Sequence, residues 1–146
     1  MKEVNNIENI LNEYGAYIGT VQGDSMMPML VQGRDRVVIE TLAFPPKKYD
    51  VVLYRRNGRY VLHRIIKVTK KGYLICGDNR VFIERDIKGK DIIGILKGFF
   101  YNGKYIEITD EKYLKYAEKV CRTRVKRKLI FYKNAIIRKI KNIRAK

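Results

Sequence analysis

Three side chains in the sequence have the types that nucleophilic catalysis requires. Ser25 offers a hydroxyl, His63 is the only histidine of the chain, and Asp78 offers a carboxylate. A serine hydroxyl is a poor nucleophile until a base removes its proton, and neutral imidazole is suited to that task near pH 7. A carboxylate on the second ring nitrogen would fix the tautomer and stabilise the imidazolium. If folding brings them together, these residues could attack a carbonyl group.

Each of the three also has an ordinary structural interpretation. Ser25 lies in a Gly/Pro turn, where an isolated serine is usually structural. His63 falls within an expected strand, in phase with Val61 and Ile65, where a histidine often serves packing or hydrogen bonding. Asp78 stands in Gly-Asp-Asn, a composition typical of turns. Catalysis therefore needs all three residues at one place.

The elements that would position these residues are mostly strands. After residue 16 the sequence consists of short apolar or alternating runs, rich in Val, Ile and Tyr and separated by turn residues. Asn57-Gly58 and Asn102-Gly103 tolerate the positive φ angles of type I′ turns and predict two hairpins. The fold class is therefore mainly β, as a small antiparallel barrel or sandwich. The expected strands are Tyr17–Val21, Arg36–Glu40, Asp50–Arg55, Tyr60–Val68, Tyr73–Cys76, Ile92–Phe100 and Tyr105–Ile108.

Helical spacing marks both ends of the chain. Ile7, Ile10 and Leu11 fall on one side of a short N-terminal helix. After Thr109, apolar residues recur at steps of three and four between Lys and Arg, which predicts a basic amphipathic helix with a break near Arg122-Thr123. Its apolar residues are Val125, Leu129, Tyr132, Ile136, Ile140 and Ile143. The sequence thus divides into an N-terminal helix (1–14), a β domain (15–109) and a basic C-terminal helical segment (110–146).

The charge is concentrated in the C-terminal segment. The chain has 32 Lys and Arg against 15 Asp and Glu, a formal net charge of +17, and residues 119–146 contain no acidic residue. An anionic partner is therefore expected. Three roles for this segment remain open: its apolar stripe packs on the β domain, it binds an anionic membrane surface, or it binds nucleic acid. Nucleic acid is the least favoured, since no known reader motif is found.

Several protein classes are excluded by the sequence. No apolar run approaches the ~18 residues of a membrane span, and the N-terminus is too polar for a secretory signal. Cys76 and Cys121 are too few and too far apart for a disulfide framework or a metal-ligand cluster. We therefore expect reduced thiols, no cofactor and no metal. The expected location is cytoplasmic, with peripheral attachment to the inner face of the cell membrane if the basic segment binds lipid.

Four segments resemble, in order, the boxes of the type I signal peptidase and LexA-like serine peptidase superfamily. Gly23–Pro28 (Gly-Asp-Ser-Met-Met-Pro) is similar to its Gly-x-Ser-Met-x-Pro nucleophile motif. Asp50–Val52, Val61–Ile65 (Val-Leu-His-Arg-Ile) and Gly77–Asn79 are similar to its other three boxes. The resemblance covers residues 17–100 and implies a LexA/signal-peptidase-like β fold.

The resemblance also implies roles for individual residues. His63 stands where many members have a lysine, which is similar to the Ser-His signal peptidases of the endoplasmic reticulum and of some Gram-positive bacteria and archaea. Ser25 would form an acyl-enzyme and His63 would act as its base, with the Ser25 N–H donating to the oxyanion. Asp78 is the first choice to orient His63, and Glu84 and Asp86 are the alternatives.

The expected function is that of a serine endopeptidase for signal- or leader-like peptides. The resemblance implies an extended substrate beside a sheet edge, with small side chains near the cleaved bond. LexA-like self-cleavage at an Ala-Gly bond is not expected, because the sequence contains no Ala-Gly pair. The alternative is a non-catalytic, peptidase-like module that binds anionic membrane or nucleic acid through residues 119–146.

Overall fold

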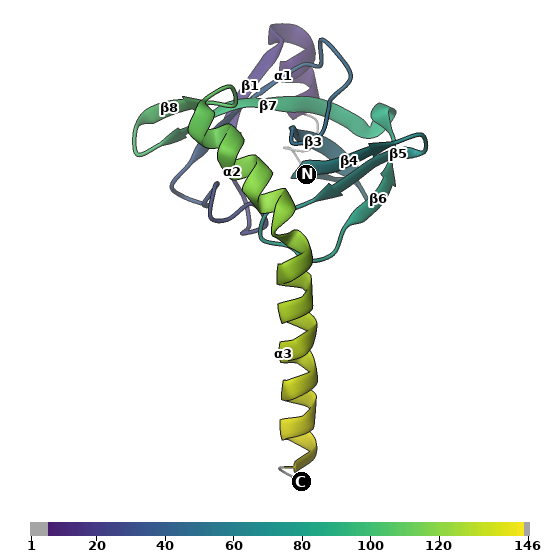
Figure 1. The fold of residues 1–146 in the computed structure, drawn as a ribbon. Helices are drawn as coiled ribbons and strands as arrows, with labels where there is room; N and C mark the ends of the chain where they lie inside the picture. Colours follow the sequence, from purple (N-terminus) through teal and green to yellow (C-terminus); the bar gives the residue numbers. More distant parts are fainter. Residues whose placement is uncertain (1–5, 145–146) are drawn as a thin grey trace.

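The computed structural model describes residues 6–144, whose β strands form one antiparallel sheet flanked by helices at both ends of the chain (Figure 1). The elements are α1 (Asn6–Tyr14), β1 (Ala16–Thr20), β2 (Arg36–Glu40), β3 (Val51–Arg56), β4 (Arg59–Thr69), β5 (Gly72–Cys76), β6 (Glu84–Ile87), the 3₁₀ turn η1 (Gly89–Asp91), β7 (Ile92–Tyr101), β8 (Lys104–Glu107), α2 (Glu111–Arg122) and α3 (Arg124–Arg144). The predicted mainly β class is confirmed. Residues 1–5 and 145–146 of the predicted terminal segments lie outside the described residues.

The strand order is β1-β2-β7-β3-β4-β5-β6, with β8 also paired to β7. Among residues 6–144 every pairing is antiparallel, and the sheet that these residues form does not close into a barrel. The long strand β7 pairs with β2 on one side and with β3 and then β8 on the other. Asn57 and Gly58 have φ angles of 49° and 73°, so the predicted β3–β4 hairpin is present. This hairpin carries His63 on its second strand.

Strand β6 is the element that the sequence analysis missed. Its sequence, Glu-Arg-Asp-Ile, lacks the alternation of the other strands and has one β-branched residue, Ile87. It forms because β5 offers a free edge, on which Ile87 lies opposite Tyr73 and Glu84 opposite Ile75. The missed strand matters because it places Glu84, on the edge of the sheet, within reach of His63 on β4.

The sheet separates two apolar clusters. Because successive strand residues point to opposite faces, β3 gives Val51 and Leu53 to one cluster and Val52 and Tyr54 to the other. The larger cluster also takes Leu11 of α1, Met26 and Leu30 of the loop after β1, and Tyr113 and Ala117 of α2. Strand β4 therefore turns its side chains alternately towards two different environments.

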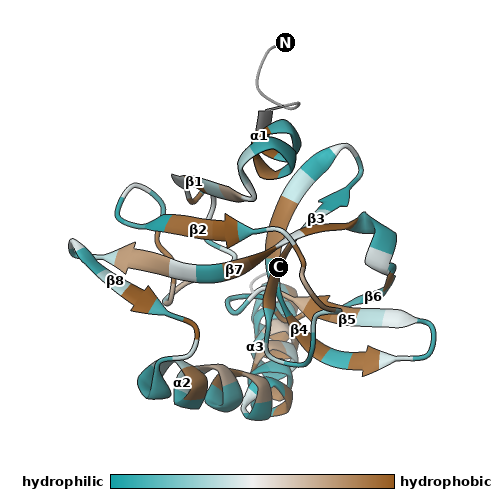
Figure 2. Ribbon diagram, turned by 90° about the horizontal axis from the view of Figure 1, so that it is seen from above, coloured by the Kyte–Doolittle hydropathy of each residue, from teal (hydrophilic) through white to brown (hydrophobic). Residues whose placement is uncertain are grey.

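The two C-terminal helices differ in how they meet the sheet. Helix α2 is capped by Asp110, whose side chain accepts a 2.8 Å hydrogen bond from the Lys112 N–H. It crosses one side of the sheet and has both hydrophilic and hydrophobic residues (Figure 2). Its buried residues are Tyr113, Ala117 and Val120. The chain turns at Thr123, as the sequence predicted, and α3 extends away from the sheet (Figure 1). Between residues 6 and 144, no helix combines the length and apolarity that crossing a membrane requires.

Candidate active site

Ser25 lies half-buried in the loop between β1 and β2, which is fixed from both sides. On one side of the loop, Met26 and Leu30 are buried in the larger apolar cluster. On the other side, the Ser25 carbonyl accepts a 2.8 Å hydrogen bond from the Asn79 backbone N–H. The side-chain amide of Asn79 donates to the Asp24 carbonyl at 3.1 Å. The serine loop is therefore held on the turn that follows β5.

His63 is 9% exposed and its ring is held through one nitrogen. Nδ1 lies 3.0 Å from Glu84 Oε1 and 3.1 Å from the Tyr54 hydroxyl, and Arg56 Nη1 pairs with Glu84 Oε2 at 2.8 Å. When Nδ1–H donates its hydrogen bond to the Glu84 carboxyl oxygen, Nε2 keeps its lone pair. Burial lowers the pKa of His63 and outweighs the opposite effect of Glu84, so the imidazole is neutral at pH 7.

The free nitrogen of His63 and the serine loop meet above the Cα of Gly77. A methyl group added at Gly77 would lie 2.6 Å from the Ser25 carbonyl oxygen and 3.1 Å from His63 Nε2. Both groups therefore flank one point at contact distance, and only glycine leaves room for them. The Ser25 backbone and the His63 ring are thus brought to one place.

Replacing Gly77 by alanine should push the Ser25 loop away from His63. We expect a loss of roughly 1–3 kcal/mol in the free energy of unfolding, measured in urea, because the closest neighbour is backbone and cannot rotate aside. Gly89 is the matched control, since nothing lies within 4 Å of its added methyl. Equal stability of the two alanine variants would contradict the described packing.

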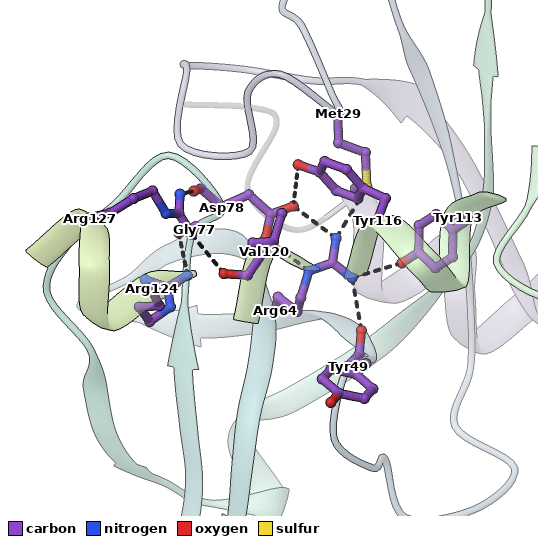
Figure 3. A network of polar contacts seen from close by, with 10 residues as sticks. All are labelled: Met29, Tyr49, Arg64, Gly77, Asp78, Tyr113, Tyr116, Val120, Arg124 and Arg127. Carbon is purple, nitrogen blue, oxygen red and sulfur yellow. Dashed lines mark hydrogen bonds and ion pairs between the residues drawn. The ribbon is translucent and has the colours of Figure 1, made fainter. Parts of the chain in front are cut away.

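Asp78 is placed differently from the expectation that it orients His63. Its carboxylate is 1% exposed and binds Arg64, with Oδ1 2.8 Å from Nε and Oδ2 2.8 Å from Nη2. The Tyr116 hydroxyl donates to Oδ2 at 3.1 Å (Figure 3). Arg64 follows His63 in β4 and so points to the opposite face of the strand. The carboxylate on His63 is that of Glu84, the alternative, while Asp86 is exposed.

A family model described as Peptidase S24-like matches residues 3–97, more than half of the chain. The chain belongs to the Peptidase S24-like family. The match spans Ser25, His63 and Glu84, and it agrees with the resemblance to the LexA and signal peptidase superfamily. Comparison with curated proteins found no match. Family membership supports a peptidase fold with serine peptidase chemistry at the level of the family.

Two open cavities adjoin the site of this Peptidase S24-like domain. The larger, about 970 Å³, is lined by Ser25 and by apolar side chains that include Tyr17, Val21 and Leu62. The smaller, about 540 Å³, is lined by His63, Glu84 and Phe82, and Arg80 lines both cavities. Ser25 and His63 therefore line different cavities, and Arg80 is the residue that the two linings share. Within the described part of the chain, no three His, Cys, Asp or Glu residues gather as metal ligands would.

The C-terminal helices support the S24-like site in a way that the sequence analysis missed. Arg124, 5% exposed, donates to the Arg80 carbonyl at 2.7 Å and to the Gly77 carbonyl at 3.2 Å. Arg127 donates to the Asp78 carbonyl (Figure 3). Both arginines belong to the basic run assigned to an anionic partner, and their only sequence signal is a spacing of three just after the break at Thr123.

Proposed function

We propose that this protein is a serine endopeptidase that cleaves signal- or leader-like peptides with Ser25 as nucleophile and His63 as general base. One observation carries the proposal: His63 Nε2 and the Ser25 loop flank the same point above Gly77, while Glu84 occupies Nδ1. Glu84 is assigned as the positioning residue for His63. Asp78 is assigned a structural role through Arg64.

In the acylation step, Ser25 Oγ attacks the peptide carbonyl carbon and its proton passes to His63 Nε2. The carbonyl oxygen becomes an oxyanion, to which the Ser25 N–H is assigned as donor. The C–N bond then breaks, and His63 returns the proton to the leaving amine. Glu84 stabilises the imidazolium while it carries that proton.

In the deacylation step, water takes the place of the departed amine. His63 removes a proton from the water as its oxygen attacks the ester carbonyl carbon. The bond from that carbon to Ser25 Oγ breaks, and the proton on His63 passes to Oγ. The products are the enzyme in its starting state and a carboxylic acid, which releases its proton to solvent at neutral pH.

The groove beside Ser25 suits a substrate in extended conformation. Strand β1 ends the sheet order and lines the groove with Tyr17 and Thr20, so an extended peptide can lie beside this edge of the sheet. Tyr17, Val21 and Leu62 line the groove with apolar surface. This lining favours the small or apolar side chains of signal-like peptides.

Labelling with a serine-directed phosphonate reagent tests the assigned nucleophile. We expect one covalent adduct, located by mass spectrometry on Ser25, because an activated serine hydroxyl attacks phosphorus as it attacks a carbonyl. Ser25→Ala should remove the adduct without changing the thermal unfolding midpoint. Ser25 is the only serine of the chain, so an adduct on any other residue, or no adduct in the folded chain, would exclude the proposed nucleophile.

The pH profile of cleavage tests the assigned base. Only the neutral imidazole accepts a proton, so kcat/KM should rise with pH and reach half its plateau at the pKa of His63, which burial places below 6.5. Glu84 raises that pKa, so Glu84→Gln should move this limb to lower pH and reduce the plateau roughly 10²- to 10⁴-fold. Arg80 lowers the pKa and Asp78 raises it, and both remain in the variant.

Asp86→Asn is the control for the Glu84 experiment. It removes an exposed carboxylate from the same strand and should leave both the limb and the plateau unchanged. If the Glu84→Gln variant and the wild type have the same pH profile, the rise of kcat/KM with pH reflects the titration of a group other than His63.

A further inference from the structure

Helix α3 presents a row of apolar side chains to solvent. The row, here called the outer stripe, recurs at steps of three and four residues along one side of the helix. Its members are between 44% and 69% exposed. They are Val125, Leu129, Tyr132, Ile136, Ile140 and Ile143.

The outer stripe does not face the β domain. Helix α3 contacts that domain through Arg124 and Arg127 on the turn carbonyls and through Phe131, whose ring lies 5.9 Å from that of Phe82. At 3.6 residues per turn, Arg127 and Phe131 lie on the face opposite Leu129 and the rest of the stripe. Packing of the stripe on the β domain, one of the three expectations, is therefore not what the structure shows.

The charge of α3 limits what can cover the stripe. Residues 124–144 contain nine Lys and Arg and no Asp or Glu. A second copy of α3 would bring like charges together with no acidic complement. Nucleic acid would neutralise the bases but leave the stripe in water. An anionic lipid surface complements both features, because headgroups attract the bases while apolar side chains enter the interface.

We propose that α3 lies on an anionic membrane surface with its outer stripe inserted at the interface. The flanking Lys and Arg contact lipid headgroups. No span is formed, and the β domain stays outside the bilayer, attached at the Arg124 end of the helix. This docking does not depend on peptidase activity.

The position of the site relative to the membrane follows from the same contacts. Arg124 and Arg127 bind the carbonyls of Gly77, Asp78 and Arg80, the turn on which the Ser25 loop rests. A membrane-bound α3 therefore holds the groove close to the lipid surface. This step rests on the proposed function, and it names the substrate class as peptides that emerge from, or lie on, a membrane.

The experiment measures co-sedimentation of the full chain with phosphatidylcholine vesicles, with and without phosphatidylglycerol. We expect binding to the anionic vesicles at least about tenfold tighter than to phosphatidylcholine alone, and weaker binding at high salt. The double variant Leu129→Gln/Ile136→Gln keeps every Lys and Arg of α3 and a favourable helix propensity. It should weaken vesicle binding at least about tenfold. Phe44→Gln, at a side chain 82% exposed on the β domain, is the matched control and should bind like the wild type.

Three results would overturn the proposal. The wild-type chain could fail to bind anionic vesicles. Alternatively, the double variant could bind them as well as the wild type, which would show that charge alone accounts for the binding. A chain that is dimeric by light scattering, and becomes monomeric in the double variant without any lipid binding, would assign the stripe to a second copy. Circular dichroism confirms that the variant remains helical. The Ser25→Ala variant should bind vesicles normally. Failure of the proposed nucleophile, seen by labelling, can therefore be distinguished from failure of the proposed membrane docking, seen by vesicle binding.

Discussion

Replacing His63 by alanine will lower kcat for peptide cleavage by about 10⁴-fold or more. The imidazole is the only neutral base whose free nitrogen faces the Ser25 loop in the described structure, and its loss leaves the serine proton without an acceptor. The measurement is single-turnover cleavage of a fluorogenic peptide with small side chains at the cleaved bond. KM should change much less than kcat, because the groove walls are untouched.

Lys67→Ala is the control for the His63 variant. It lies on the same strand, is exposed, and should retain wild-type kcat. Thermal unfolding of both variants separates a catalytic loss from a folding loss. Substantial cleavage by a folded His63→Ala protein would require another base and would remove His63 from the mechanism.

Asp78→Asn should cost about 3–5 kcal/mol in the free energy of unfolding. Arg64 is 0% exposed, and Asp78 is the carboxylate that pairs with it through two 2.8 Å contacts. The amide keeps the shape of the side chain but leaves the buried guanidinium without its counter-charge. Urea unfolding at neutral pH, followed by circular dichroism, measures the difference.

The exposed Asp86 provides the matched comparison. Asp86→Asn removes the same charge from the protein surface and should change stability by less than about 0.5 kcal/mol. If both variants are equally stable, the buried pair is not the main support of the turn. An unstable Asp78→Asn chain with normal phosphonate labelling below its unfolding midpoint would separate the structural role of Asp78 from the chemistry at Ser25.

The strands and helices followed from local signals in the sequence. The two Asn-Gly turns, the alternating runs and the break at Thr123 each depend on a few neighbouring residues, and each is present in the structure. Strand β6 depends instead on a free edge of β5, a property of the assembled sheet that no local pattern records. Elements that exist because of a neighbour, rather than their own residues, are those that sequence reasoning misses.

The same distinction applies to the candidate site. The types and order of the residues indicated Ser25 and His63, but spacing along the chain does not say which carboxylate reaches the imidazole. The pleat of β4 decides it, since His63 and Arg64 point to opposite faces and each takes a different acid. The missed strand β6 supplies one acid and the turn after β5 supplies the other. The roles of Arg124 and Arg127 were hidden because the basic run was interpreted only as surface charge.

The contacts of α2 and α3 bear on where this protein can be shortened. The family match ends at residue 97, and a division of the chain at residue 109 looks natural from its sequence. A protein truncated there would lose the Tyr113 and Tyr116 hydroxyls that contact the Arg64–Asp78 pair. It would also lose Arg124 and Arg127, which donate to carbonyls of the turn that holds the serine loop. The smallest fragment that retains the whole scaffold of the site therefore extends to Arg127, thirty residues beyond the matched segment.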